Sequence, residues 1–225
     1  MTIEWPRLEQ LLNEFARYNL AIWPMQVFAY ALGIVALCLA MQQTHYSSRI
    51  VAGILSFLWL WIAIVPRWPD PARGFSVVDA YYVPLSALQG VMHLADVFRP
   101  RISFGSRRDT YSAAGILLIG YAMVGYPVIA HLLGRGYPQS PPFGLVPCPT
   151  MVFTIGLLLL ADSRVSKRFL VAPFLWGIIG FFAPFIGLWE DVGLFMAAVV
   201  GIPLIIIRDG RRRGQETERV RTTLD

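Results

Sequence analysis

Charged residues are scarce in this chain of 225 residues. Asp, Glu, Lys and Arg make up 15% of it, whereas soluble domains carry about 25%. Hydrophobic residues make up 56%, and a soluble fold of this size cannot bury that much apolar surface in one core. A lipid bilayer can surround such a surface, so the composition argues against a soluble domain and favours an integral membrane protein.

Lysine and cysteine are also almost missing. Lys167 is the single lysine among nineteen basic residues, and no basic stripe with interleaved aromatic residues predicts a nucleic-acid partner. The formal charge is +5, and its basic residues lie between apolar runs, where we expect them to meet an anionic membrane surface. Cys38 and Cys148 belong to no paired motif, so neither a disulfide framework nor a zinc ribbon is predicted. We expect no cofactor.

The N-terminal segment lacks the apolar stretch and the small-residue cleavage site of a secretory signal peptide. Its pattern instead predicts an amphipathic helix, because four apolar side chains share one helical face: Leu8, Leu11, Leu12 and Phe15. We expect residues 1–21 to form an interfacial helix that lies on the membrane or packs against the loops. A helix that caps the end of a bundle is the simpler interpretation.

Apolar runs in the rest of the chain predict transmembrane helices, since about 20 apolar residues cross the hydrocarbon of a bilayer. These runs are residues 22–41, 50–65, 78–97, 111–134, 143–161, 169–187 and 192–207. The run 78–97 contains Pro84, Gln89 and His93, so a re-entrant or interfacial segment is the alternative there. The predicted fold is therefore all-α: a polytopic transmembrane helix bundle of about seven spans, with six as the alternative, in residues 22–207.

The basic residues in the loops predict an orientation for this bundle. With seven spans, fourteen of them fall on the side of the C-terminus and five on the other side. Basic loops remain in the cytoplasm, so we expect a multi-pass membrane protein with a basic cytoplasmic tail, residues 208–225. This tail is expected to be disordered or a short surface helix. The C-terminus stays cytoplasmic with six spans as well.

The densest group of polar and helix-breaking residues is the stretch 120–156. Five prolines between 138 and 149 predict irregular backbone that dips into the membrane where protein buries it. Pro149 suits a first helical turn, which leaves Cys148 near a helix N-terminus, where the thiolate form is favoured. The candidate ligand or pathway residues in this stretch are Tyr126, His131, Tyr137, Cys148, Thr150 and Thr154. A small buried cysteine and an interfacial histidine are the simpler interpretations.

Two adjacent acids, Glu190 and Asp191, complete the set of candidates. They lie in a short connection between two apolar runs, and that connection contains no basic residue. Acids at the membrane surface are candidates for cation or proton entry. The alternative is that Asp191 only caps the following helix, for which aspartate is well suited.

Four segments resemble a family of uncharacterised bacterial polytopic membrane proteins, domain of unknown function 6064. They are FARYNLAIWPMQ (15–26), GYPVIAHLLGRGYP (125–138), FGLVPCPTMVFTIGLLLL (143–160) and LWEDVGL (188–194). The most specific match is the stretch from Phe143 to Gly156 that contains Pro147-Cys148-Pro149-Thr150. The resemblance implies a bacterial inner-membrane protein and no particular activity.

Three functions fit these observations. The first is a small transporter, permease or channel-like protein for a neutral or cationic species, with Glu190 and Asp191 at its mouth. The second is a thiol, metal or redox protein that uses Cys148. The third is a non-catalytic membrane subunit, with a homo-oligomer or another membrane protein as its partner beside the lipid bilayer.

Overall fold

The computed structural model describes residues 8–42, 44, 46–65, 77–105 and 109–222. This part of the chain is built from helices, and its single β feature is an isolated bridge between Phe104 and Ala161. The α-helices are α1 (Leu8–Ala21), α2 (Met25–Gln42), α3 (Ser47–Ile64), α4 (Val77–Phe98), α5 (Thr110–Gly120), α6 (Tyr126–Leu132), α7 (Pro147–Leu159), α8 (Arg168–Phe182), α9 (Val192–Met196) and α10 (Ile202–Thr222). The all-α prediction is confirmed for the described residues.

Five of the predicted spans are helices long and apolar enough to cross a membrane. These are Met25–Gln42, Ser47–Ile64, Thr110–Leu132, Arg168–Ile186 and Trp189–Gln215. The count of seven is not supported, because α4 is not among the five and α7 has only 13 residues. Both are nevertheless helices at the predicted places, so the sequence located the elements correctly and overstated how many have the length and hydropathy of a span.

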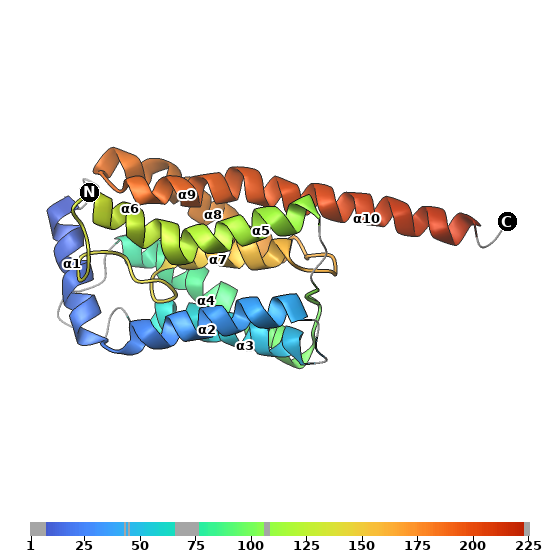
Figure 1. Cartoon of the computed structure of the whole chain (residues 1–225), viewed down its shortest axis with the longest axis horizontal. Helices are drawn as coiled ribbons and strands as arrows, with labels where there is room; N and C mark the ends of the chain where they lie inside the picture. Colours follow the sequence, from blue (N-terminus) through green and yellow to red (C-terminus); the bar gives the residue numbers. More distant parts are fainter. Residues whose placement is uncertain (1–7, 43, 45, 66–76, 106–108, 223–225) are drawn as a thin grey trace.

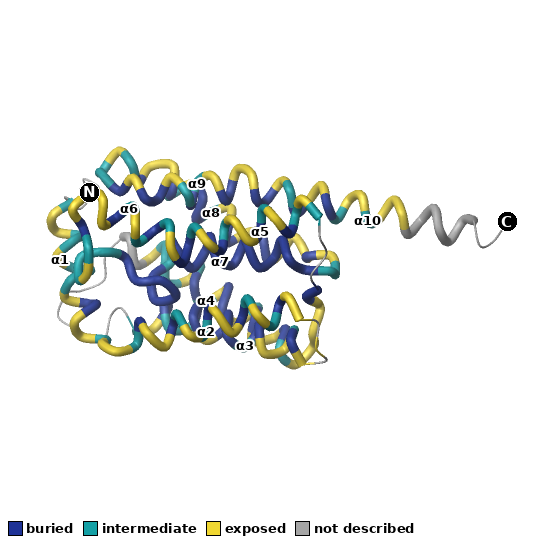
Figure 2. The backbone as a smooth tube through the Cα atoms, viewed as in Figure 1, coloured by how far each residue is buried: buried dark blue, intermediate teal, exposed yellow. Residues whose placement is uncertain are grey.

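The helices pack side by side into an elongated bundle with α7 at its centre (Figure 1). Eleven of the 13 residues of α7 are buried. This burial accounts for the mostly apolar side chains of the helix. Figure 2 shows the buried backbone running along the middle of the bundle and the exposed backbone on the outer helices. α1 lies across one end, and α10 extends beyond the other end.

α1 is fastened to the bundle by hydrogen bonds from its last turn. Asn19 Nδ2 donates to the carbonyls of Pro138 (2.6 Å) and Ser140 (2.8 Å) in the loop after α6. Tyr18 donates to the carbonyl of Leu145 and accepts from Trp61 Nε1. Burial raises the pKa of the Tyr18 hydroxyl, so this phenol remains a donor. The helix thus packs against a loop, one of the placements expected for it.

The proline-rich loop between α6 and α7 enters the bundle, and its backbone is irregular, as the prolines predicted. Phe143 and Leu145 are almost completely buried, and the ring of Phe143 lies 5.0 Å from those of Tyr30 and Phe153. Gly144, between them, has φ of 77°, a conformation that favours glycine. Irregular backbone is tolerated inside such a bundle because protein surrounds it.

Two π-helical segments precede prolines inside the long helices. Tyr121–Gly125 lies directly before α6, which starts with Tyr126-Pro127, and Ala197–Gly201 precedes Ile202-Pro203. Proline lacks the N–H that would bond the carbonyl four residues earlier. For Pro127 this carbonyl belongs to Met123, and the hydroxyl of Tyr30 donates to it at 3.0 Å. The helix thus contains a π-helical turn before Pro127, and the carbonyl of Met123 has a hydrogen-bond partner in α2.

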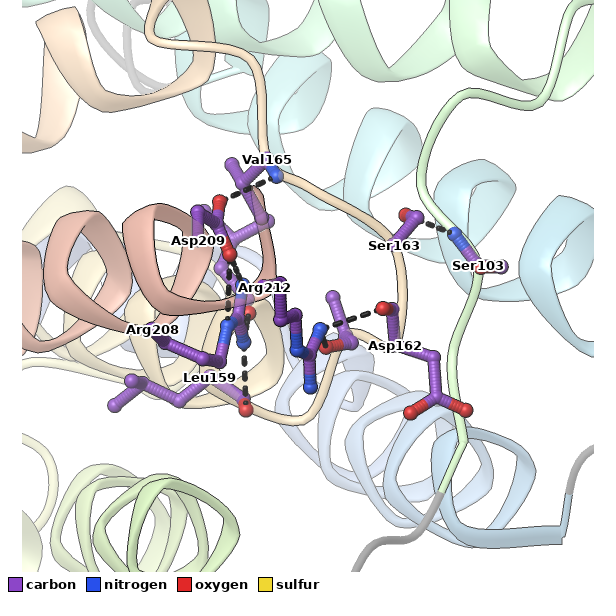
Figure 3. A network of polar contacts seen from close by, with 10 residues as sticks. Ser103, Leu159, Asp162, Ser163, Val165, Arg208, Asp209 and Arg212 are labelled. Carbon is purple, nitrogen blue, oxygen red and sulfur yellow. Dashed lines mark hydrogen bonds and ion pairs between the residues drawn. The ribbon is translucent and has the colours of Figure 1, made fainter. Parts of the chain in front are cut away.

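In the described part of the C-terminal tail, residues 208–222, the chain is helical, because α10 continues to Thr222. Polar contacts hold α10 where it leaves the bundle (Figure 3). Arg208 Nη1 donates to the carbonyls of Leu158 (2.8 Å) and Leu159 (2.9 Å), and Asp209 accepts from the backbone N–H of Val165. Arginine thus satisfies the last carbonyls of α7, which have no partner within that helix.

Candidate functional site

The two acids singled out by the sequence are buried at the end of the bundle where α1 lies. Glu190 and Asp191 belong to the 3-10 turn Trp189–Asp191, and at most 2% of either residue is exposed. Asp191 precedes α9, yet its side chain makes no capping hydrogen bond there. Its Oδ1 instead accepts a hydrogen bond from the hydroxyl of Tyr126. The interpretation of Asp191 as only a helix cap is therefore wrong.

Glu190 forms a buried ion pair with Arg135. Arg135 Nη2 donates to Glu190 Oε2 at 2.7 Å, and Arg135 Nη1 donates to the carbonyl of Gly187 at 2.8 Å. The connection itself contains no basic residue, and the base that pairs with Glu190 comes instead from the loop after α6. Arg135 was not among the predicted site residues. The glycines on both sides of it, which are typical of a helix C-terminus, were the available signal.

A glycine turn aims Arg135 at the acids. Gly134 has φ of 77°, its N–H donates to the carbonyl of His131, and the next N–H, that of Arg135, donates to the carbonyl of Ala130. This is the Schellman arrangement, in which a left-handed residue closes the helix and reverses the chain. Gly187, with φ of 96°, closes the turn Ala183–Ile186 in the same way. Gly134 thus directs Arg135 toward the acids. Gly187 closes the turn before Glu190, and its carbonyl accepts from Arg135.

Two tyrosines and a cysteine complete the cluster. The hydroxyl of Tyr121 donates to the carbonyl of Glu190 at 2.6 Å, and its ring stands edge-on to that of Tyr126. Tyr121 is the first residue of the π-helical segment Tyr121–Gly125, and Tyr126 is the first residue of α6. The thiol of Cys148, in the first turn of α7, lies within hydrogen-bonding reach of Asp191 and Tyr126. We call these six residues the carboxylate cluster: Tyr121, Tyr126, Arg135, Cys148, Glu190 and Asp191.

The charges of this cluster do not balance. Two carboxylates face one guanidinium, and Glu190 Oε1 is buried without a hydrogen-bond partner among the described residues. An uncompensated charge in a low-dielectric interior is costly. The remaining negative charge therefore favours a proton or a cation at Asp191. The same carboxylate opposes a second negative charge on Cys148, so the arrangement suits a neutral thiol better than the thiolate expected from the helix N-terminus.

The other four predicted residues make different contacts. Thr150 and Thr154 donate to the carbonyls four residues earlier, those of Val146 and Thr150. Thr154 also accepts from Trp59 Nε1 at 3.1 Å. His131 is exposed at the end of α6, and the exposed ring of Tyr137 packs against Trp23. The described residues contain no group of three His, Cys, Asp or Glu side chains able to hold a metal ion.

One protein family matches residues 8–216, and it is described only as a family of unknown function, DUF6064. No curated protein matches the chain. No solved structure matches it either.

Proposed function

The chain belongs to the family of unknown function DUF6064, and we propose from its geometry that it is a multi-pass membrane protein that moves a small neutral or cationic species across the bilayer. Its centre in this proposal is the carboxylate cluster. The site residues of the proposal are Tyr126, Cys148, Glu190 and Asp191 from the sequence analysis, with Tyr121 and Arg135 added by the structure.

The five long apolar helices are compatible with a membrane protein, and the arrangement of α4 supports this assignment. The buried face of α4 consists of Ser86, Gln89, Gly90, His93 and Asp96, while Leu88, Val91 and Leu94 are exposed. Such a helix is inverted relative to one in water, where apolar residues face inward. The apolar side of α4 faces outward, as it does in a helix that contacts lipid, although α4 is not one of the five long apolar helices.

The observation that supports transport is the unbalanced charge in the carboxylate cluster. Acids inside a membrane protein mark proton and cation pathways by default, and here two of them lie at the N-terminal end of a helix that a π-turn interrupts. A broken helix that presents polar groups to a site is typical of transporters. The loop charges support an orientation with the C-terminus in the cytoplasm. In that orientation the carboxylate cluster lies near the outer side.

Proteoliposomes test this proposal. The probes are protons, followed with a trapped pH-sensitive dye, and Na⁺ and K⁺ under an imposed membrane potential. We expect vesicles with the protein to dissipate a gradient of at least one of these ions faster than empty vesicles, and Asp191→Asn to abolish the difference. Glu9→Gln is the matched control, because Glu9 is exposed on α1. If vesicles with and without the protein behave alike for all three ions, ion transport is wrong.

Thiol chemistry at Cys148 is the second candidate, because its sulfur contacts both Asp191 and Tyr126. Cys148→Ser keeps a hydrogen-bonding group of similar size and removes the thiol. A transporter should keep its flux in this variant, whereas a thiol enzyme or redox protein should lose all activity. A membrane subunit is the third candidate, and it predicts a protein that co-purifies in a fixed ratio.

A further inference from the structure

A second polar site lies between α4 and α8, separate from the carboxylate cluster. Ser86, Gln89 and His93 follow one another on one face of α4, and each is at most 1% exposed. Tyr82, one turn before Ser86, contacts the ring of Trp176, while His93 packs 5.2 Å from the ring of Phe169. Trp176 and Phe169 both belong to α8. Ser86 and Gln89 therefore face α8 between these two contacts.

This interface contains polar atoms without partners. Ser86 Oγ, Gln89 Oε1 and Trp176 Nε1 are all buried, and none has a hydrogen-bond partner among the described residues. Gln89 Nε2 and His93 Nε2 lie 3.3 Å apart. Other polar groups in or beside α4 are satisfied: Ser56 of α3 donates to the carbonyl of Gly90, and Asp96 accepts from the backbone N–H of Arg101. The missing partners are thus confined to one short stretch of the interface.

The part of α8 that lies across from Ser86 and Gln89 cannot supply the missing hydrogen-bond partners. Ala172 and Pro173 lie between Phe169 and Trp176, are buried, and have no polar side chain. Buried polar groups that protein leaves unpaired are usually bonded to ordered water or to a ligand.

We propose that the interface between α4 and α8 binds a small uncharged molecule that both donates and accepts hydrogen bonds. Trp176 Nε1 can only donate, Gln89 Oε1 can only accept, and Ser86 Oγ does both, so the bound molecule needs both functions. It is uncharged because this stretch presents no charged side chain. The molecule is either resident water or a small polar solute, of which urea is the simplest probe. This proposal does not depend on transport through the carboxylate cluster.

Hydroxyl-radical footprinting of the protein in detergent micelles tests this proposal. Hydroxyl radicals that form from water bound next to an aromatic ring oxidise that ring. Trp59 is the internal control, since it is fully buried and its Nε1 donates to Thr154. We expect Trp176 to be oxidised about threefold or more faster than Trp59, given the water that unpaired polar groups hold. Equal rates in the wild-type protein would overturn the proposal.

Variants separate a bound molecule from mere exposure of Trp176. Ser86→Ala with Gln89→Leu should bring oxidation of Trp176 down to the rate of Trp59, with an unchanged or higher melting temperature, because apolar groups replace unpaired polar ones. Ser56→Ala is the matched control and should leave Trp176 labelling unchanged. If the double variant does not fold, Gln89→Leu alone should lower the rate; a variant that folds and labels like the wild type contradicts the proposal.

Proteoliposomes then distinguish the two sources of the ligand. Shrinkage in a gradient of impermeant sucrose measures water, and swelling in a urea gradient measures the solute. Urea uptake that falls in Ser86→Ala with Gln89→Leu identifies a solute site. Oxidation of Trp176 that depends on these two side chains, without urea uptake, identifies resident water.

Discussion

Arg135 Nη2 lies 2.7 Å from Glu190 Oε2, although the two residues are 55 positions apart in the sequence. The pair joins the loop after α6 to the turn before α9, and both side chains are shielded from solvent. Burial makes each partner dependent on the other, because a charge left alone inside the protein costs more than a solvated one. The ion pair therefore fixes these two segments, which lie at the same end of the bundle, with respect to each other.

Arg135→Met should destabilise the protein strongly. Removing one partner of a buried ion pair costs about 3–5 kcal/mol, which chemical denaturation in detergent can measure. Adding Glu190→Gln should restore much of the loss, because it removes the unpaired charge. Arg211→Met is the matched control, since Arg211 is exposed on α10. Equal, small effects of Arg135→Met and Arg211→Met would show that the buried pair does not form.

Gly193 is required where α9 packs against the π-helical segment Tyr121–Gly125. A Cβ atom at this position would overlap the ring of Tyr121, whose hydroxyl bonds the carbonyl of Glu190. Gly193→Ala should therefore cost about 1–3 kcal/mol or more, as overpacking does, and the loss should shrink when Tyr121→Ala is added. Gly120→Ala is the control: nothing lies within 4 Å of its Cβ position, so alanine should stabilise the helix by about 0.5–1 kcal/mol. Similar losses in both variants would contradict this packing.

The sequence predicted the positions of the helices well, because long apolar runs separated by charged residues are compatible with few structures other than apolar helices joined by polar loops. It also singled out Tyr126, Cys148, Glu190 and Asp191, which the structure brings together, since polar residues at helix ends are conspicuous in an apolar chain. Arg135 escaped detection because its partner is set by how distant helices pack, which no local pattern encodes.

The inverted face of α4 carried a usable signal. Ser86, Gln89, His93 and Asp96 recur at helical spacing inside an otherwise apolar run, and this periodicity indicates one polar side. Gln89 and His93 had indicated only that this run could be a re-entrant or interfacial segment instead of a span. The number of spans was overstated for a related reason: length and hydropathy describe contact with lipid, whereas α7 is surrounded mostly by protein.

Arg208 should hold α10 against α7. Arg208→Met removes the donor to the carbonyls of Leu158 and Leu159 and leaves Asp209 without its cationic neighbour, which lies 2.9 Å away. Each lost hydrogen bond to a charged group costs about 1.5–3 kcal/mol. We expect faster hydrogen exchange at the end of α7 and in the first turns of α10, measured by mass spectrometry. Arg211→Met should leave exchange unchanged, and the same pattern in both variants would contradict the anchoring role.

The chain should remain with membranes during an alkaline carbonate wash. The expected reason is that its exposed outer surface is apolar, with Leu117, Val124 and Phe174 each more than half exposed, and detergent should be needed to extract it. A loosely bound peripheral protein serves as the control and should be released. Recovery of the intact, monodisperse chain in the aqueous fraction would contradict the assignment to the membrane, and transport through the carboxylate cluster with it.

Asp191 should also control the reactivity of Cys148. The thiolate is the nucleophile, and a carboxylate within hydrogen-bonding reach opposes its formation. Asp191→Asn removes that charge, so alkylation of Cys148 by a small maleimide in detergent should become faster, by about tenfold if the change is worth 1.4 kcal/mol. Cys38 provides a control in the same molecule, because it is exposed on α2 and its rate should not change. Acceleration at both cysteines would indicate general loosening of the fold, and no acceleration at Cys148 would show that Asp191 does not act on the thiol.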